Sequence, residues 1–413
     1  MSCKQSVSIG KLITFSRGGG WGKDYEFNDS IRVAVVRGAD FPSIEQGRFI
    51  GLPIRYEKRT KVRSVALRPG DVVLENSGGT DNRPTGRTLL ISQKLLDSYD
   101  CPVIPASFCR LLRFEVENVD SIYMYYWLQD MYKSGRTWGY QNRSTGISNF
   151  QFKIFSDQEL VSLPSFEEQK RIVDTLLIID RKRIINSLIN DYLATLVDLE
   201  FSKRFSSSVS TTSLKNVLEI STKSLKPQQH VGETWEHYSI PAFDEVHWPI
   251  FELADGIKSN KYIVDSSSIL ISKLNPSIKR MWIPVCLTDK AVCSTEFIVY
   301  KPLEPRHKSF YCAAINANNF TAFLLEHVTG STGSRQRVQP KATLDYPIPN
   351  PCRTAIEAFC DFADPIYRQI EINEIESQHL GSLRDALLPK LMSGEIDVSK
   401  VDLTQLNNHL YVQ

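Results

Sequence analysis

The residue patterns that could support catalysis are few in this chain, and none has the spacing that a known chemistry needs. Gly18-Gly19-Gly20-Trp21-Gly22-Lys23 resembles a phosphate-binding loop, but its glycine spacing is wrong and no Ser or Thr follows the lysine to bind magnesium. We interpret this segment as a glycine-rich surface loop. The seven histidines form no H-E-x-x-H motif, and there is no G-x-S-x-G motif. The sequence therefore predicts a chain that is not an enzyme and binds no metal or cofactor itself.

The cysteines and the composition indicate ordinary globular domains. The eight cysteines include no C-x-x-C pair, so we expect free thiols in a reducing compartment. A chain of 413 residues is long enough for two or three domains. No apolar run approaches the roughly 20 residues of a membrane span, and residues 1–6 do not resemble the start of a secretion signal. We therefore expect a cytoplasmic protein that has no membrane contact.

The net charge of +2 limits how this chain could bind a nucleic acid. A protein that holds DNA alone through many phosphates is usually more basic, because each phosphate contact uses a lysine or an arginine. If nucleic acid is the ligand, the basic residues must be concentrated locally, or other subunits must share the binding.

Polar and basic residues, mixed with aromatic residues and glycines, gather in turn-rich segments. Arg, Asn and Gln can read base edges through paired hydrogen bonds, and Lys and Arg neutralise phosphates. For any single residue, the alternative of an ordinary solvated loop stays open. The residues that we predict to contact nucleic acid are Arg17, Lys23, Asn82, Arg83, Arg87, Arg136, Tyr140, Asn142, Arg143, Lys273, Lys279, Arg280, Arg335 and Arg337.

The elements that must position these residues occur twice. Ser144-Thr145-Gly146 precedes Leu163-Pro164, and 187 residues after the first triplet Ser331-Thr332-Gly333 precedes Ile348-Pro349. This period is too long for a solenoid repeat and suits a duplicated domain. Further upstream, residues 8–13 align with 213–218, and the run that ends at residue 74 aligns with the run that ends at 271.

Each copy is predicted to be an α+β domain. Short runs rich in Val, Ile, Phe and Tyr alternate with Gly, Pro, Asn and Asp, which is typical of strands and turns. The expected strands include 31–36, 72–74, 107–114, 269–272 and 297–300. One amphipathic helix is expected in each copy, at 121–133 in the first and at 307–328 in the second.

A long helix follows each copy. Ser165 is a good N-cap with Glu168 at N3, which together form a capping box, while Asn350 and Pro351 are the expected N-cap and N1 residues of the second helix. Gly394 is expected to end that helix. Both helices carry apolar stripes at spacings of three and four, so we expect them to form an antiparallel coiled coil. The alternative is that each helix packs on its own domain.

These features resemble the specificity subunit of type I restriction–modification systems. The resemblance rests on residues 163–173 (Leu-Pro-Ser-Phe-Glu-Glu-Gln-Lys-Arg-Ile-Val), on residues 383–396, on the Ser-Thr-Gly triplets and on the L-x-P-G-D turn at residues 67–71. It spans nearly the whole chain. The second copy departs from it at residues 352–354, where Cys-Arg-Thr stands in place of Glu-Glu-Gln, and at residues 265–268, which lack the Pro-Gly-Asp turn.

The resemblance implies an α+β chain with two tandem target-recognition domains, separated by two long helices that form an antiparallel coiled coil. The implied divisions are a first target-recognition domain at 1–164, a central spacer helix at 165–205, a second target-recognition domain at 206–349, a C-terminal spacer helix at 350–395 and a tail at 396–413.

The resemblance also implies how such a chain works. Each domain would read one half of a bipartite site in double-stranded DNA, while the helices would set the gap and dock two methyltransferase subunits. Those subunits would supply S-adenosylmethionine, and a restriction or translocase subunit could join them. Two alternatives stay open: the recognition portion of a single-chain restriction–modification enzyme, and a coiled-coil adaptor that has no DNA specificity.

Overall fold

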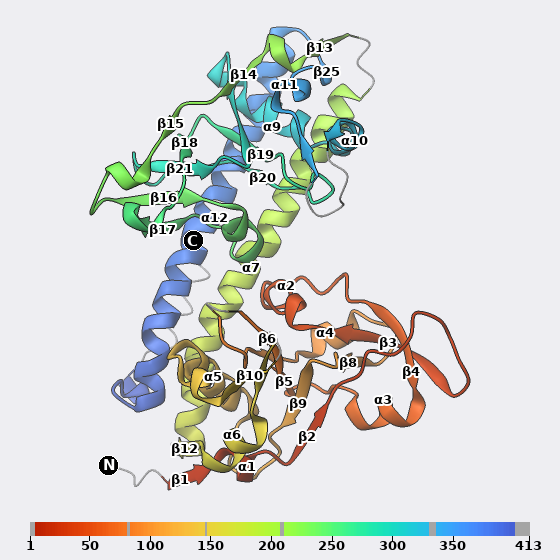
Figure 1. Ribbon diagram of the computed structural model, residues 1–413, viewed down its shortest axis with the longest axis vertical. Coiled ribbons are helices and arrows are strands. Elements are labelled where there is room, and N and C mark those ends of the chain that lie inside the picture. Colours follow the sequence, from red (N-terminus) through yellow and green to blue (C-terminus); the bar gives the residue numbers. More distant parts are fainter. Residues whose placement is uncertain (1–4, 81–82, 145–146, 207–209, 330–335, 401–413) are drawn as a thin grey trace. The chain divides into compact units, whose positions relative to one another are not determined.

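The computed structural model describes residues 5–80, 83–144, 147–206, 210–329 and 336–400. The chain forms two compact units, each of which contains one part of both long helices (Figure 1). Unit 1 comprises residues 1–188 and 374–413, and unit 2 comprises residues 189–373. The linear domain limits that the sequence suggests stay a prediction.

Unit 1 is built from short strands joined by turns and small helices. Its strands are β1 (Gln5–Ser8), β2 (Phe15–Gly18), β3 (Ser30–Val36), β4 (Ile54–Lys58), β5 (Val72–Glu75), β6 (Ser77–Gly79), β7 (Thr88–Leu90), β8 (Val103–Pro105), β9 (Cys109–Arg113), β10 (Gln141–Ser144), β11 (Ile147–Phe150) and β12 (Leu160–Leu163). The sheets have the orders β2-β9-β5-β7, β4-β3-β8, β10-β11-β6 and β1-β12, and only β3 and β8 pair in parallel among the described strands of this unit.

Unit 2 repeats this topology. Its strands are β13 (Thr211–Ser213), β14 (Leu218–Ser221), β15 (Ser224–Leu225), β16 (Thr234–Tyr238), β17 (Ile250–Leu253), β18 (Lys261–Ile263), β19 (Ile269–Ser272), β20 (Met281–Trp282), β21 (Ala291–Ser294), β22 (Phe297–Pro302), β23 (Val328–Thr329), β24 (Arg337–Val338) and β25 (Pro347–Pro349). The order β14-β22-β19-β20 matches β2-β9-β5-β7, and β13-β25 matches β1-β12. Strand β16 pairs in parallel with β21, as β3 does with β8.

The matching sheet orders confirm the duplication that the sequence predicts. Strands β12 and β25 end at the two Leu/Ile-Pro pairs, and each pairs antiparallel with the first strand of its own unit. The Ser-Thr-Gly triplets that first indicated the repeat lie largely outside the described residues.

Helices connect the sheets, and α7 and α12 are by far the longest described. The helices are α1 (Ile9–Leu12), α2 (Phe41–Glu45), α3 (Arg59–Val65), α4 (Gln93–Asp97), α5 (Ser121–Lys133), α6 (Phe152–Gln158), α7 (Phe166–Phe205), α8 (Ile240–Glu245), α9 (Lys308–Asn316), α10 (Asn318–Glu326), α11 (Pro340–Thr343) and α12 (Arg353–Ser393). No helix in the described ranges is long and apolar enough to span a membrane.

Two of the predicted helices need correction. The helix expected at 307–328 is interrupted at Ala317, whose ψ of 145° is extended, so that α9 and α10 form separately. The second long helix begins at Arg353 rather than just after Asn350, because the backbone N–H of Asn350 donates to Ser210 O and continues the pairing of β13 with β25. The helix predicted at 121–133 is confirmed as α5.

The start of α7 is fixed by the residues that the sequence singles out. Ser165 N–H donates to Glu168 Oε2 at 2.9 Å, and Glu168 N–H donates to Ser165 Oγ at 3.3 Å, which confirms the capping box. The buried Gln169 donates to Asn118 O and Pro164 O and accepts from Asp120 N–H, so it ties α7 to the end of β12 and to the turn that precedes α5. At the end of α12, Gly394 has a φ of +79°, as expected for the residue that ends this helix.

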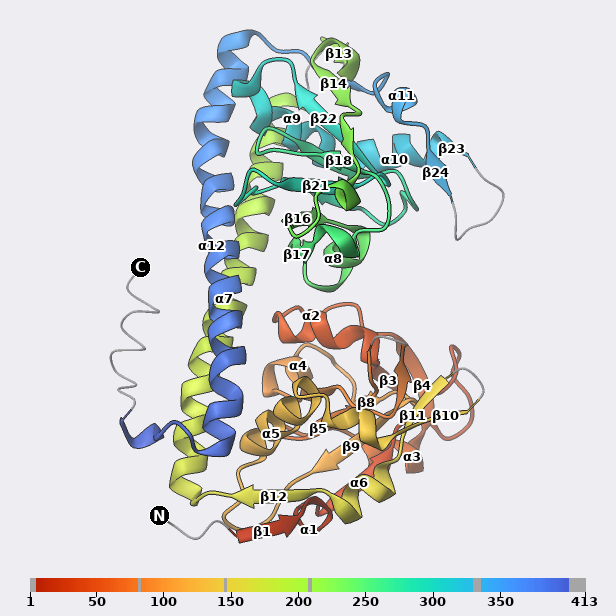
Figure 2. The ribbon, with the colours of Figure 1, turned by 60° about the vertical axis from the view of Figure 1, so that its left-hand side comes forward.

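In unit 1, α7 and α12 pack antiparallel through polar and apolar contacts (Figures 1 and 2). Arg384 of α12 donates to Asp180 of α7 at 3.0 Å, and Tyr126 of α5 donates to the same carboxylate at 2.8 Å. Asn186, which is 1% exposed, donates to Glu376 at 2.7 Å. These contacts fix the register of the two helices and hold α5 against them.

In unit 2 the same pair of helices is held mainly by aromatic packing. Phe201 and Phe205 of α7, Phe310 of α9 and Phe359 of α12 have ring centroids between 5.2 and 6.0 Å apart and belong to one core cluster. The tilted and edge-on ring geometries are those that aromatic pairs prefer. Each unit therefore packs its own part of both helices into its core, so both arrangements that the sequence allowed are present.

Phe359→Ala should destabilise unit 2, because Phe359 is completely buried at the centre of the four rings. We expect a loss of about 3–5 kcal/mol in the free energy of unfolding, measured by chemical denaturation. Leu303→Ala is the control, since Leu303 is 58% exposed and should change stability by less than about 0.5 kcal/mol. Equal effects of the two substitutions would contradict the aromatic core.

Candidate nucleic-acid interface

The glycine-rich loop of unit 1 is held against two neighbouring strands. A Cβ on Gly19 would lie 2.1 Å from Pro105 O, and a Cβ on Gly22 would lie 2.4 Å from Tyr56 O. Gly22 also has a φ of +65°, which favours glycine. The glycines therefore allow the loop to lie directly on the backbone of β8 and β4, which agrees with a structural loop rather than a phosphate-binding one.

Basic and aromatic side chains lie beside this loop. The Arg55 guanidinium stacks on the Trp21 ring at 4.7 Å, and the exposed Lys23 lies 5.1 Å from the ring centroid of Tyr25. Arg17 is exposed on β2. No carboxylate within the described ranges forms an ion pair with Arg17 or Lys23, so both charges are available to a ligand.

Helix α3 adds basic residues that the sequence analysis missed. Lys58, Arg59 and Arg63 are exposed on or next to this helix, and Lys61 donates to Gly18 O at 3.0 Å. This bond joins α3 to β2 and its glycine loop. The charge run Lys-Arg-Thr-Lys-Val-Arg at residues 58–63 could have indicated this site, since local runs of basic residues are typical of nucleic-acid contacts.

The sheet β10-β11-β6 positions a second group of predicted residues. Asn142 is exposed on β10 and pairs with Asn149 of β11, whose side chain accepts from Ser77 of β6. Arg143 is the next residue of β10. Asn82 and Arg335 lie outside the described residues.

Arg83 and Arg87 are both next to the buried carboxylate of Glu75. Arg87 makes two hydrogen bonds to it, at 2.7 and 2.9 Å, and also donates to Gly38 O at 2.9 Å. Arg83 lies 3.9 Å from the same carboxylate and donates to Gly78 O. Glu75 therefore compensates the charge of Arg87 directly and that of Arg83 more weakly, and Arg87 holds the loop in place.

Arg136 and Tyr140 share the carboxylate of Glu159. Arg136 donates to Glu159 at 2.7 Å and Tyr140 donates to it at 2.7 Å, while Asp130 lies 3.1 Å from Arg136. Burial, the Glu159 hydrogen bond and its negative charge raise the pKa of Tyr140 to about 12. These two side chains brace the segment that leads into β10.

In unit 2, the two predicted arginines that the structure describes are also paired. Arg280 is 7% exposed and makes two hydrogen bonds to Asp244, at 2.6 and 2.8 Å. The exposed Arg337 binds Glu296 at 3.0 and 3.1 Å. Lys279 is exposed and donates to Asn316 O, whereas Lys273 contributes backbone hydrogen bonds to Glu296 and Val338.

The predicted residues therefore fall into two groups by their surroundings. Arg17, Lys23 and Asn142 are exposed and carry no internal carboxylate partner among the residues that the structure describes. Arg87, Arg136, Arg280 and Arg337 are held by carboxylates and shape the loops. In the part of the chain that the structure describes, no group of three His, Cys, Asp or Glu side chains could hold a metal ion. Whether any of these residues contacts DNA stays a prediction.

The family model for the type I restriction modification DNA specificity domain matches residues 5–193. The match covers the β-rich part of unit 1 and more than half of α7, and unit 2 repeats the same sheet topology. Residues 5–193 therefore belong to the type I restriction modification DNA specificity domain family. These findings support a DNA target-specificity subunit of a type I system, a family that is non-catalytic.

The fold agrees with a solved member of the specificity family. The S subunit of a type I system from M. genitalium is 15% identical, with a TM-score of 0.52, over 94% of this chain and 95% of that one. The HsdS subunit from Thermoanaerobacter tengcongensis is 16% identical over 95% and 97% of the two chains, with a TM-score of 0.33. No curated protein sequence matches the chain. The first comparison confirms an α+β fold in which two long helices pack together.

Gly19→Ala should disrupt the glycine loop, because the new methyl group would overlap the backbone of β8. We expect a loss of about 1–3 kcal/mol, typical of overpacking, and a fall in Tm of about 2–4 °C for each kcal/mol, measured by thermal denaturation. The neighbouring Gly18→Ala is the matched control, since nothing lies within 4 Å of a Cβ there. A Tm that is the same for both variants would show that the loop does not rest on β8.

Proposed function

We propose that each unit reads one half of a bipartite site in double-stranded DNA, so that the chain directs a type I complex to an asymmetric target. The duplicated sheet topology carries this proposal, because two copies of one domain offer two recognition surfaces in a single chain. The membership of a family that confers DNA specificity supports it. We expect the chain to act in the cytoplasm.

In unit 1 we propose that Arg17, Lys23 and the basic residues of α3 neutralise phosphates, and that the exposed Asn142 contacts a base edge. Phosphate contacts position a protein on DNA, whereas amide side chains can distinguish bases. These residues are supported by the exposure of all but the half-buried Lys61. Among the described residues no carboxylate forms an ion pair with Arg17, Lys23, Lys58 or Arg63, whereas Arg59 lies 3.7 Å from Asp29.

Unit 2 offers a different surface at the corresponding place. Strand β17 pairs with β16 as β4 pairs with β3, but Glu252 takes the position of Arg55 in this register. Phe251 and Leu253 of β17 are 45% and 55% exposed. In unit 1, by contrast, the matching strand β4 leads into the basic helix α3. We therefore expect the two units to read different half-sites.

We further propose that α7 docks methyltransferase subunits. Ile189, Tyr192, Leu196 and Leu199 recur at spacings of three and four along α7, and they are 40%, 76%, 46% and 64% exposed. An exposed stripe of this kind is typical of a helix that packs against a partner. The docked subunits would carry S-adenosylmethionine and the adenine-modifying site, and a restriction or translocase subunit could join them.

The role of α3 is tested by the double variant Lys58→Gln and Arg63→Gln, bound to DNA together with the methyltransferase subunit. Loss of phosphate contacts should weaken binding on all sequences and reduce the slope of log K against log[salt] by about 0.9 per contact. A gel-shift titration at several salt concentrations measures both effects.

The matched control for this test is Lys11→Gln with Lys94→Gln, which removes the same charge from exposed positions on α1 and α4. It should leave the salt slope unchanged. Equal slopes for the two double variants would contradict phosphate binding by α3. Failure of the wild-type complex to select any bipartite consensus from random DNA would favour an adaptor without DNA specificity.

The spacing role of the helices is tested by paired insertions at the unit boundary, after Leu188 in α7 and after Asn373 in α12. Seven residues in each helix add about 10.5 Å of helix, so the gap between the half-sites should grow by about three base pairs at ~3.4 Å each. Site selection from random DNA measures the gap. Altered half-site bases with an unchanged gap would show that the helices do not set the spacing.

A further inference from the structure

The two units place a carboxylate at corresponding positions of the long helices. Asp198 of α7 and Asp385 of α12 lie 187 residues apart, which is the offset of the Ser-Thr-Gly triplets. In unit 1, Asp385 binds Lys133, the last residue of α5. In unit 2, Asp198 binds Asn316, the last residue of α9. The duplicated fold thus offers a lysine to one carboxylate and only an amide to the other.

This difference decides whether the negative charge is compensated. Burial alone would raise the pKa of Asp385, but Lys133 and the adjacent Arg384 outweigh it and lower that pKa. Burial raises the pKa of Asp198, and the Asn316 hydrogen bonds and the charge of the nearby Lys279 offset this only in part. A partly buried carboxylate whose charge is only partly compensated is costly, because an amide replaces only some of the lost solvation.

No basic side chain in the described ranges forms an ion pair with Asp198. Both of its oxygens accept from the Asn316 side chain, at 2.8 and 2.9 Å. Lys279 lies nearby, but it donates to the backbone oxygen of Asn316 instead. The remaining acceptor positions of the Asp198 carboxylate are therefore open to a donor from outside the unit.

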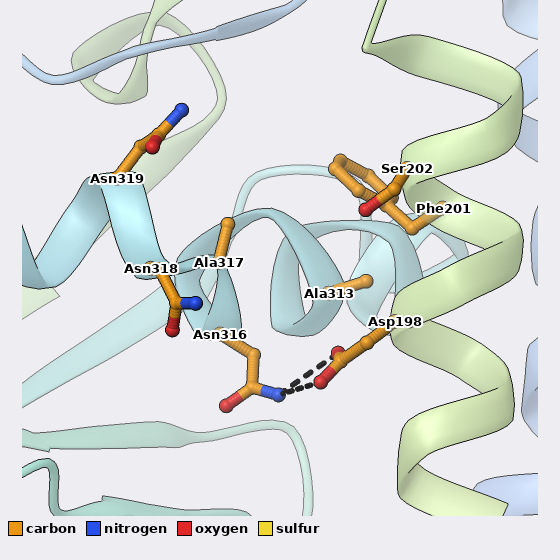
Figure 3. A pocket seen from close by; sticks show the side chains of 8 residues that line it. All are labelled: Asp198, Phe201, Ser202, Ala313, Asn316, Ala317, Asn318 and Asn319. Atoms are coloured by element: carbon orange, nitrogen blue, oxygen red, sulfur yellow. Dashed lines mark hydrogen bonds between the residues drawn. The ribbon is translucent and has the colours of Figure 1, made fainter.

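Asp198 and Asn316 meet in a pocket of 260 Å³ between α7 and the junction of α9 with α10 (Figure 3). The helical path breaks beside the pocket at Ala317, which separates the two short helices. Its other lining residues are Phe201, Ser202, Ala313, Ala317, Asn318 and Asn319. The lining thus combines acceptor groups with the apolar wall of Phe201 and the alanines, which suits the stem and head of a long basic side chain.

The exposed stripe of α7 indicates the source of that side chain. Ser202, which lines the pocket, lies three residues after Leu199, so the two are neighbours on the helix surface. Leu199 is 64% exposed, and Leu196 and Tyr192 continue the exposed apolar stripe of α7. A small cation or polyamine would occupy the pocket without covering these apolar residues. A protein that covers the stripe would bring side chains to the pocket as well.

We propose that the Asp198 pocket receives a lysine or arginine side chain of the protein that docks on α7. The resulting ion pair would be the counterpart in unit 2 of the Asp385–Lys133 pair that unit 1 makes internally. This inference rests on the proposed docking of a methyltransferase subunit. The inserted side chain would fix the position of the partner along the helix, which a uniform apolar stripe does not do by itself.

The test compares two substitutions that affect the pocket in different ways. Asp198→Asn removes the charge, and Asn316→Lys supplies an internal lysine as in unit 1. The affinity of the full chain for its methyltransferase subunit is measured by titration calorimetry, and the Tm of the free chain is measured alongside. We expect both variants to bind at least tenfold more weakly, while Asn316→Lys keeps or raises the Tm of the free chain.

The possible results separate the inserted side chain from the docking itself. If the wild-type chain binds the methyltransferase subunit and both variants bind within twofold of it, the inserted side chain is refuted and the docking proposal stands. If the wild-type chain does not bind, the docking proposal itself fails. A rise in Tm with spermidine or Mg²⁺ that Asp198→Asn abolishes, together with unchanged partner binding, would assign the pocket to a small cation and overturn the proposal.

Discussion

The antiparallel packing of α7 against α12 is the constraint on which the rest of the structure depends. Neither helix can bury its apolar face alone, and the buried polar contacts fix which residues face one another. Asn186 binds Glu376 in unit 1, and Asn190 binds Asn373 in unit 2. Because a buried amide is satisfied in only one register, a slip of one turn would separate the buried Asn186 and Asn373 from these partners. The register in turn determines where α5 and α9 can dock.

Duplication supplies a common skeleton on which two surfaces differ. The same sheet orders recur, and the first and last strands of each copy pair in the same way. At one register position, however, the first unit carries Arg55 and the second carries Glu252. Backbone pairing fixes the skeleton, while the outward side chains are free to vary, so one fold can serve two different targets.

Internal ion pairs explain how a nearly neutral chain can still be a DNA specificity subunit. Arg87, Arg136, Arg280 and Arg337 are held by carboxylates within their own units. A bidentate arginine–carboxylate pair is rigid, so these residues stabilise loops. Lys58 and Arg63 are exposed and form no ion pair among the described residues, so they are the charges that we propose for phosphate contacts.

The sequence by itself determined the features that depend on near neighbours. The capping box of Ser165, the extent of α5 and the strand pattern follow from residues that are close in the chain, while the duplication follows from the likeness of segments 187 residues apart. Only the tertiary structure decided the break at Ala317, the start of α12 at Arg353 and the carboxylate that each arginine binds. Arg280 and Asp244 are 36 residues apart, and Arg337 and Glu296 are 41 apart. No local pattern encodes such pairings, because they arise from sheet and helix packing that brings distant segments together.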